Sequence, residues 1–292
     1  TRTINPLAVD GNMAEVTDPR NRREPGVWGM ISYSLANFPA GFLLLAVAVW
    51  LMRLYCPSED ETGRILLISP GMFGTISFVV MIVAGFTDLF VGYFSDRTRG
   101  KSGRRQPYMR WGLPFLALSF LLLWFPPIQG QSPWNILWLT IMLGTIHVSF
   151  TVVVNPYLAL MPEVWQEDAS RVRDSVWMSV ANALSQIFAF VGFGVAIDTF
   201  MNGGNLFGFY LPDGFKLVAI IGGLFTILFF IPVLRVKEPP ASDDKNVDLS
   251  LKDAVMETLK NPAFIPYIIA GSMLFGAQFI IEAALPYLVV TQ

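Results

Sequence analysis

Long apolar segments alternate with short polar segments along most of this chain. Seven of the apolar stretches have the length of a membrane-spanning helix, which needs about 20 mainly apolar residues. They cover approximately residues 27–52, 71–95, 109–127, 134–161, 175–200, 215–236 and 263–290. They end near proline, glycine or charged clusters, which are ordinary helix boundaries. The pattern therefore predicts an all-α polytopic membrane protein.

The composition narrows the class of protein further. Hydrophobic residues make up 53% of the chain and charged residues 14%, whereas soluble domains carry about 25% charged residues. The single cysteine, Cys56, excludes an internal disulfide, and one cysteine with one histidine cannot supply a zinc site of ordinary spacing. The sequence contains neither a phosphate-binding loop nor a nucleophile elbow. We therefore expect no enzyme, no metal site and no cofactor.

The basic residues are distributed unevenly between the polar segments. If the N-terminus is cytoplasmic, only Arg53, Arg64 and Lys216 lie on the outer side. Cytoplasmic loops carry an excess of Lys and Arg, so the sequence predicts an N-terminus inside the cell (plasma or inner) membrane. Tryptophans near predicted helix ends, among them Trp28 and Trp124, are expected to anchor the helices at the membrane interfaces.

The order of segments predicts four parts. Residues 1–26 form a cytoplasmic tail, 27–236 a six-helix transmembrane bundle, 237–262 a cytoplasmic linker, and 263–292 one further transmembrane helix. In the linker an apolar helical face consists of Leu251, Ala254, Val255 and Leu259. This face predicts an amphipathic helix at the membrane surface; the alternative is a disordered linker. A bundle followed by one helix indicates a fragment of a longer chain.

Two segments carry motifs. The first is Gly92-x-x-x-Asp96-Arg97-Thr98-Arg99 with Gly103-Arg104-Arg105-x-Pro107, and it resembles the loop after helix 2 in major facilitator transporters. The second is Pro156–Tyr157–Leu158–Ala159–Leu160–Met161–Pro162–Glu163, followed by Arg171 and Arg173. Together with Asp88 four residues before Gly92, it resembles the glycoside–pentoside–hexuronide:cation symporters. The resemblance implies two six-helix halves around a midplane site, of which this chain holds the N-terminal half and the first helix of the C-terminal half.

Asp88 lies inside the second apolar stretch. A carboxylate there is costly and usually marks an ion or substrate path. The resemblance implies a cation-coupling site at Asp88, assisted by Thr151. Sodium-coupled members carry a second carboxylate where Ala84 stands here, so we expect coupling to H⁺ ahead of Na⁺. The alternative is an aspartate that only hydrogen-bonds neighbouring Ser or Thr side chains.

Other predicted helices carry polar side chains at helical spacing. In the fourth, Thr140, Gly144, His147, Thr151 and Asn155 form one stripe, which should face a cavity or another helix. The candidate substrate-binding residues are Asn37, His147, Asn155, Asn182, Gln186, Gln278 and Glu282. Packing is the alternative for Asn37 and His147, and solvation near the outer interface is the alternative for Glu282.

Charged residues near the predicted cytoplasmic helix ends are candidates for an inner gate. They are Asp96, Arg97, Arg104, Arg105, Glu163, Arg171 and Arg173. The resemblance implies that this region closes the cytoplasmic side, with Arg104 and Arg105 reaching acids such as Glu163. The alternative is that the basic residues only fix the topology or contact anionic lipid.

These observations predict a secondary active transporter that couples H⁺ or Na⁺ to symport of a sugar, glycoside or similar small organic solute by alternating access. A lysolipid or lipid carrier on the same fold and a non-transporting membrane sensor are the alternatives. The expected partners are the small-molecule solute and membrane lipids, with no nucleic acid. We expect the full-length protein to be monomeric.

Overall fold

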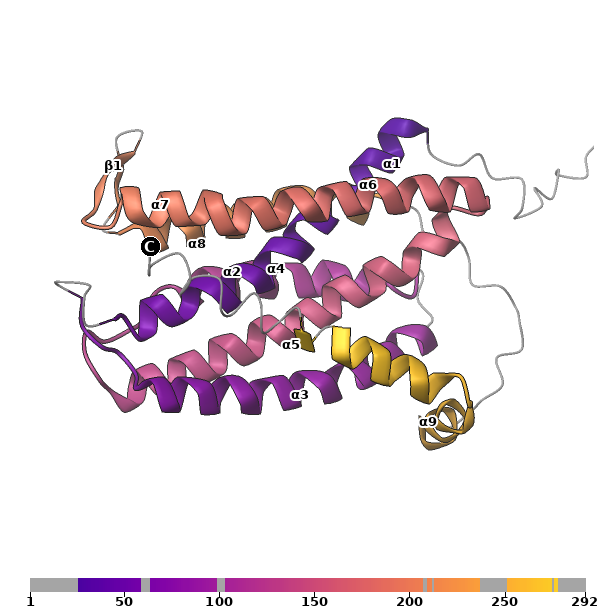
Figure 1. Cartoon of the computed structure of the whole chain (residues 1–292). Coiled ribbons are helices and arrows are strands. Elements are labelled where there is room, and N and C mark those ends of the chain that lie inside the picture. Colours follow the sequence, from indigo (N-terminus) through magenta and orange to yellow (C-terminus); the bar gives the residue numbers. More distant parts are fainter. Residues whose placement is uncertain are drawn as a thin grey trace, which may run out of the picture.

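The computed structural model describes residues 26–58, 64–98, 103–206, 209–211, 213–236, 251–274 and 276–277, and within these the side chains of 96–97, 206, 209, 211 and 251–255 lie outside the description. The helices are α1 (Val27–Ser34), α2 (Asn37–Tyr55), α3 (Pro70–Arg97), α4 (Gln106–Leu123), α5 (Pro133–Val164), α6 (Asp168–Ile187), a π-helical turn η2 (Phe188–Gly192), α7 (Phe193–Thr199), α8 (Gly214–Leu234) and α9 (Leu251–Lys260). Figure 1 shows long helices arranged roughly parallel in one bundle.

Five helical segments in the described part of the chain are long and apolar enough to cross a membrane. They are Val27–Tyr55, Pro70–Ser95, Pro133–Val164, Asp168–Thr199 and Gly214–Leu234. They confirm five of the predicted spans. The predicted span at 109–127 is instead α4, which has 18 residues and begins with a polar turn, Gln106–Arg110. The predicted span at 263–290 is described as a helix only over Phe264–Leu274, and residues 278–292 lie outside the description.

The first predicted helix is not continuous. It is broken at Leu35 and Ala36 into α1 and α2. Pro39 lies in the first turn of α2 and has no N–H to donate to the Leu35 carbonyl, against which its ring also clashes in a continuous helix. The predicted span over 27–52 is therefore confirmed as one apolar segment, Val27–Tyr55, with an interruption at Leu35 and Ala36 that the apolar pattern did not predict.

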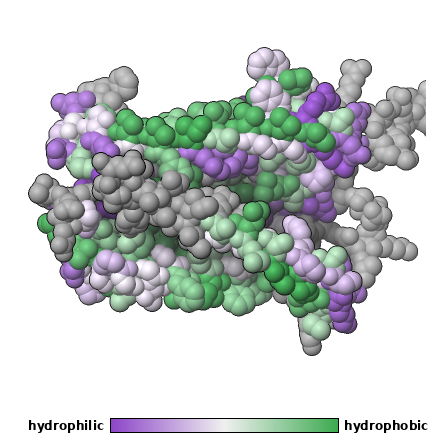
Figure 2. Space-filling model, viewed as in Figure 1, coloured by the Kyte–Doolittle hydropathy of each residue, from purple (hydrophilic) through white to green (hydrophobic). Residues whose placement is uncertain are grey.

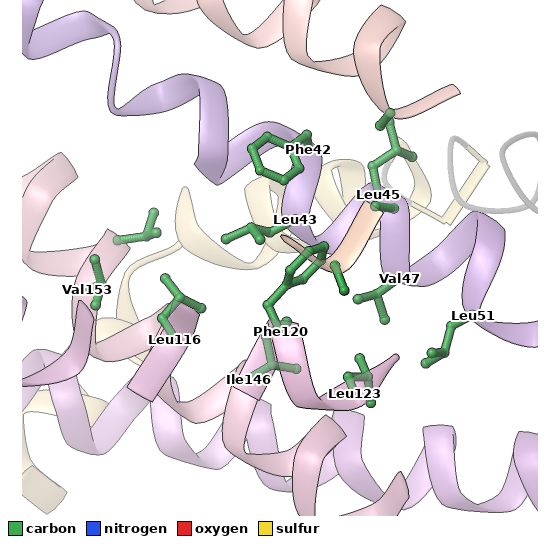
Figure 3. Packing of buried hydrophobic residues seen from close by; sticks show 14 of the residues in the cluster. Phe42, Leu43, Leu45, Val47, Leu51, Leu116, Phe120, Leu123, Ile146 and Val153 are labelled. Atoms are coloured by element: carbon green, nitrogen blue, oxygen red, sulfur yellow. The ribbon is translucent and has the colours of Figure 1, made fainter. Parts of the chain in front are cut away.

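Close helix packing builds the core of the bundle. α4 packs against α5 and α8, α3 packs against α5, and α2 packs against α6. In Figure 3, Phe42 of α2, Leu116 and Phe120 of α4, and Ile146 of α5 converge on one apolar region. Gly222 of α8 allows the close approach to α4, since a Cβ there would lie 2.2 Å from Cε1 of Phe120.

Polar segments gather at the two ends of the bundle. Figure 2 shows a row of hydrophobic residues along α6 and α7 between hydrophilic ends. At one end, α7 and α8 are joined by an antiparallel hairpin of β1 (Gly204–Leu206) and β2 (Phe209–Leu211) that the sequence did not predict. Figure 1 places α9 at the other end, where α1 begins. A helix thus forms inside the predicted linker.

The expected role of the tryptophans holds only for some of them. Trp28 is 82% exposed, as an interfacial anchor should be, but Trp124 is fully buried. The Trp124 ring stacks on Phe215 of α8 with centroids 6.0 Å apart. Trp124 follows the last residue of α4, and the packing of α8 covers it, so the prediction of an interfacial anchor was wrong there.

Candidate functional site

A cavity of about 840 Å³ lies between α2, α3, α5 and α6. The described residues that line it are Ala40, Gly41, Leu44, Leu45, Val47, Ala48, Leu51, Met52, Phe73, Gly74, Ser77, Met81, Leu143, His147, Asn182 and Gln186. Polar positions predicted on two different helices, α5 and α6, therefore meet at one place. Of the candidate substrate-binding residues, His147, Asn182 and Gln186 are in this lining.

Two amides of α6 form a pair at the cavity. The Gln186 Nε2 donates to the Asn182 Oδ1 at 2.9 Å, one helical turn apart. The bond leaves the Asn182 amide NH₂ and the Gln186 carbonyl oxygen with hydrogen-bonding capacity. A donor and an acceptor side by side suit a ligand that carries hydroxyl groups, because each hydroxyl both donates and accepts.

The predicted partners of the cation site are in direct contact. The Thr151 hydroxyl of α5 donates to the Asp88 Oδ1 of α3 at 2.5 Å. His147 lies one turn before Thr151, on the same face of α5, and interacts electrostatically with the Asp88 carboxylate. Asp88 is therefore linked through α5 to the polar lining of the cavity, although it is not itself among the lining residues.

The polar stripe predicted on the fourth span does not point to one surface. His147 lines the cavity, Thr151 contacts α3, and the Thr140 hydroxyl donates to the Ile136 carbonyl of its own helix. Asn155 is half-buried and is not among the described lining residues.

Other predicted substrate contacts lie elsewhere. The Asn37 amide donates to the Met178 backbone oxygen at 2.8 Å and so joins α2 to α6. This is the packing alternative, and it takes the Asn37 amide away from the cavity. Gln278 and Glu282 lie outside the described residues.

At the end of the bundle where α1 begins, two arginines converge on one glutamate. The Glu163 carboxylate near the end of α5 accepts from Arg104, and its Oε1 lies 2.9 Å from the Arg105 Nη1. Arg105 also donates to the Ala159 carbonyl of α5. The Arg105 side chain is 9% exposed. Its bond to the Ala159 carbonyl therefore fixes the loop before α4 to the end of α5. The expected contact between these arginines and Glu163 is therefore present.

The other candidate gate residues have local partners or lie outside the description. Arg171 donates from Nε to the Trp165 carbonyl at 2.7 Å and from Nη2 to the Pro162 carbonyl at 3.3 Å, which satisfies the end of α5. Arg173 donates to the Ser170 hydroxyl at 3.2 Å. The side chains of Asp96 and Arg97 lie outside the description.

The structure also contains a buried carboxylate that the sequence did not single out. Asp174 of α6 is completely buried, and its Oδ1 accepts from the Ser34 hydroxyl at 2.7 Å. The buried indole N–H of Trp165 is the neighbouring side-chain donor. The predicted span began at residue 175, so Asp174 was counted as a loop residue. The signal that was available is its spacing of four residues from Met178 and eight from Asn182, on the same face.

Two tyrosines near Asp174 link α1 to α5. The Tyr33 hydroxyl donates to the Tyr157 carbonyl at 2.6 Å, and the Tyr157 hydroxyl donates to the Tyr33 carbonyl at 3.2 Å. Both side chains are buried, so α1 is fixed to α5 by reciprocal bonds. Across the described residues, no three His, Cys, Asp or Glu side chains come together in a way that could hold a metal ion.

Proteins that are named as symporters match much of this chain. An uncharacterized symporter of Bacillus subtilis (strain 168), YnaJ, is 27% identical over 203 residues, which is 68% of this chain and 42% of that protein. A protein of Escherichia coli (strain K12) named "Putative glycoside/cation symporter YagG" is 30% identical over 139 residues, 47% of this chain and 28% of that protein. The inner membrane symporter YicJ of the same organism is 22% identical over 221 residues, 75% of this chain and 46% of that protein.

The chain spans less than half the length of each of these relatives. Residues 32–291 match the family described as MFS/sugar transport protein, in agreement with the loop motif after α3 and the helical bundle. The chain therefore belongs to the MFS/sugar transport protein family, within the glycoside–pentoside–hexuronide:cation symporter group of the major facilitator superfamily.

Proposed function

We propose that this chain is part of a secondary transporter that couples cation entry to uptake of a sugar, glycoside or similar small solute across the cell membrane, with its N-terminus in the cytoplasm. The observation that carries the proposal is the contact between Thr151 and Asp88 beside a cavity with polar side chains. The names of the relatives, one of them a glycoside/cation symporter, support it.

Asp88 is the proposed coupling residue. A carboxylate can hold one proton or contribute to a cation site, and the Thr151 hydroxyl orients one of its oxygens. Since α5 carries both Thr151 and the cavity residue His147, a solute bound at His147 would act on the helix that holds Asp88. This gives a physical route by which solute and ion affect each other's binding, as coupled transport requires.

A proton is the proposed ion. A sodium ion prefers several oxygen ligands, as hard cations generally do. Ala84, one turn before Asp88, offers no side-chain oxygen, and Thr151 offers one hydroxyl. A single carboxylate is enough to bind and release a proton, and His147 is a second titratable group on the neighbouring turn of α5.

The cluster around Glu163 is proposed to brace the cytoplasmic end. Its described contacts join the loop before α4 to α5, and both belong to the same half of a major facilitator fold. Rocking of the two halves as rigid bodies would leave these contacts intact. The cluster is therefore proposed to hold the inner surface of this half in shape for its closure against the other half.

Transport by the full-length protein in proteoliposomes tests the proposal. A panel of labelled sugars and glycosides would be offered under an imposed inward proton gradient, and separately under an inward sodium gradient at equal pH. We expect accumulation above equilibrium with the proton gradient, and loss of accumulation but not of equilibration in Asp88→Asn. Sodium-driven accumulation with no response to the proton gradient would contradict proton coupling, and failure to accumulate any solute would contradict the whole proposal.

A further inference from the structure

The cavity has an unusual distribution of polarity along its length. On α2 its lining extends from Ala40 to Met52, which at 1.5 Å per residue is about 18 Å. The α2 side chains along this run are all apolar. The polar side chains of the lining therefore belong to α3, α5 and α6. The level along α2 at which each polar side chain lies decides which part of a ligand can bind at each end of the cavity.

The polar groups concentrate at the Gly41 end of the cavity. A Cβ at Gly41 would lie 2.7 Å from the Asn182 Nδ2, so α6 presents its Asn182–Gln186 amide pair at that level. This end therefore offers the hydrogen-bond donor and acceptor described above, with His147 also in the lining.

The opposite end is mainly apolar, and its polar lining residue is Ser77 of α3, whose hydroxyl donates to the Phe73 carbonyl of its own helix at 2.9 Å. Leu51 and Met52 line it from α2, and Phe73 lines it from α3. The Phe73 ring lies 6.4 Å from the ring of Tyr55, centroid to centroid, which places Phe73 at the C-terminal end of α2. From Gly41 to Leu51 the rise along α2 is about 15 Å, enough to separate a sugar-sized polar region from an apolar one.

Charged groups are absent from the described lining: it includes no Asp, Glu, Lys or Arg. A phosphate, carboxylate or ammonium group placed there would lose its hydration without gaining an ion pair from this half of the transporter, which is costly. The described surface thus favours an uncharged ligand, and disfavours a lysolipid with its charged headgroup.

We infer that the solute is an uncharged glycoside with an apolar aglycone, its sugar hydroxyls at Asn182 and Gln186 and its aglycone along Leu44 toward Leu51 and Phe73. The inference rests on the proposed function and specifies its substrate class. The sugar supplies paired donors and acceptors for the two amides. The aglycone covers the apolar lining and removes it from water. The free energy gained by burying this apolar surface raises the affinity above that of the free sugar.

Uptake of matched glycosides by the full-length transporter in proteoliposomes tests this inference. The methyl and phenyl glycosides of one transported sugar would be compared with its uronic acid analogue. We expect a KM for the phenyl glycoside about tenfold below that of the methyl glycoside, and no measurable uptake of the charged analogue. Equal KM values for the two neutral glycosides, or efficient uptake of the uronic acid, would overturn the inference while leaving the proposed function standing.

Two variants test the contributions of the apolar and the polar end of the cavity separately. Leu44→Ala should raise the KM of the phenyl glycoside about fivefold with little effect on the methyl glycoside, since it removes apolar lining only. Asn182→Ala should raise both KM values in parallel. Leu118→Ala is the control, because Leu118 is a 51% exposed residue of α4 outside the lining. All variants would be checked for monodisperse elution in detergent.

The results distinguish the two proposals. If no glycoside of any kind is accumulated by the folded wild-type protein, the proposed function fails and the inference fails with it. If the parent sugar is accumulated and Leu44→Ala changes both KM values equally, only the inference fails. A selective change in the KM of the phenyl glycoside supports both.

Discussion

The Thr151 hydroxyl donates a 2.5 Å hydrogen bond to the Asp88 carboxylate, and so joins two helices across 63 positions of sequence. A carboxylate within a membrane span needs a partner, and in this structure a neutral hydroxyl is the side-chain donor recorded for it. The bond orients one Asp88 oxygen. Under the proposed function, the coupling cation would bind at this carboxyl group.

Thr151→Ala should weaken ion-driven accumulation of solute by about ten- to a hundredfold, because a hydrogen bond to a charged group contributes about 1.5–3 kcal/mol. Thr151→Ser keeps the hydroxyl and should retain most of the activity. Thr145→Ala is a matched control on the same helix, since the Thr145 hydroxyl is exposed and bonds the Ile141 carbonyl. The measurement is initial uptake against proton concentration. Equal losses in Thr151→Ala and Thr145→Ala would show that the contact has no role in coupling.

Ser34→Ala should destabilise the protein by about 1–3 kcal/mol, because it removes the hydroxyl that bonds the fully buried Asp174 carboxyl. Asp174→Leu combined with Ser34→Ala should cost less than the sum of the single changes, since both partners of the Ser34–Asp174 hydrogen bond are then removed together. Thermal unfolding in detergent measures all three variants. Additive effects would show that the two side chains do not interact.

Glu163→Gln should destabilise the cytoplasmic end more than Arg104→Ala does. It removes the charge that pairs with Arg105, whose side chain is 9% exposed, whereas the Arg104 side chain is 25% exposed. Removing one partner of a buried pair costs about 3–5 kcal/mol, and a more exposed pair contributes about 0–1 kcal/mol. Limited proteolysis and thermal unfolding would compare the two variants. A larger effect of Arg104→Ala would contradict this ranking.

Gly222→Ala should cost about 1–3 kcal/mol, because the new Cβ would lie 2.2 Å from the buried Phe120 ring. Gly223→Ala is the control on the adjacent residue, where a Cβ would be 3.5 Å from the Ala117 carbonyl oxygen, an ordinary contact. Melting temperatures in the same detergent provide the comparison. If both variants melt alike, α4 and α8 do not approach as closely as described.

Cys56 should react slowly with maleimides at neutral pH. Burial raises the pKa of the Cys56 thiol to about 11, and only the thiolate reacts. The labelling rate should therefore rise about tenfold per pH unit between pH 7 and 9. Ser58→Cys in a Cys56→Ser background places an exposed thiol nearby and should label fast. With an impermeant reagent on intact cells, protection of that thiol would contradict the proposed outer location of the α2–α3 loop.

The site was predictable where its residues lie on regular helices with polar side chains in apolar surroundings. Asp88, Thr151, His147, Asn182 and Gln186 stood out for that reason, and the resemblance to symporters linked the first two. Asn37 has the same sequence signal, yet its amide bonds the Met178 carbonyl. Helical spacing gives the face of one helix, and the facing neighbour depends on packing between helices that are distant in sequence.

Asp174 shows the opposite case, a buried polar residue that the sequence pattern placed in a loop. Its burial depends on the start of α6 lying against α1, and no local pattern reports that contact. The interruption at Leu35 and Ala36 does not appear in the apolar pattern either, because apolar length continues through it and only Pro39 marks it.

The apolar spans, the helical faces and the expected positive-inside orientation follow from the amino-acid sequence, because they depend on transfer energies and on helical periodicity within one segment. The tertiary contacts add that Trp124 at the end of α4 is buried against α8, that Thr151 meets Asp88, and that Asn182 and Gln186 share a cavity with Leu44. These are contacts between segments far apart in the chain, and they depend on which helix packs beside which, a choice made by the shapes of whole faces.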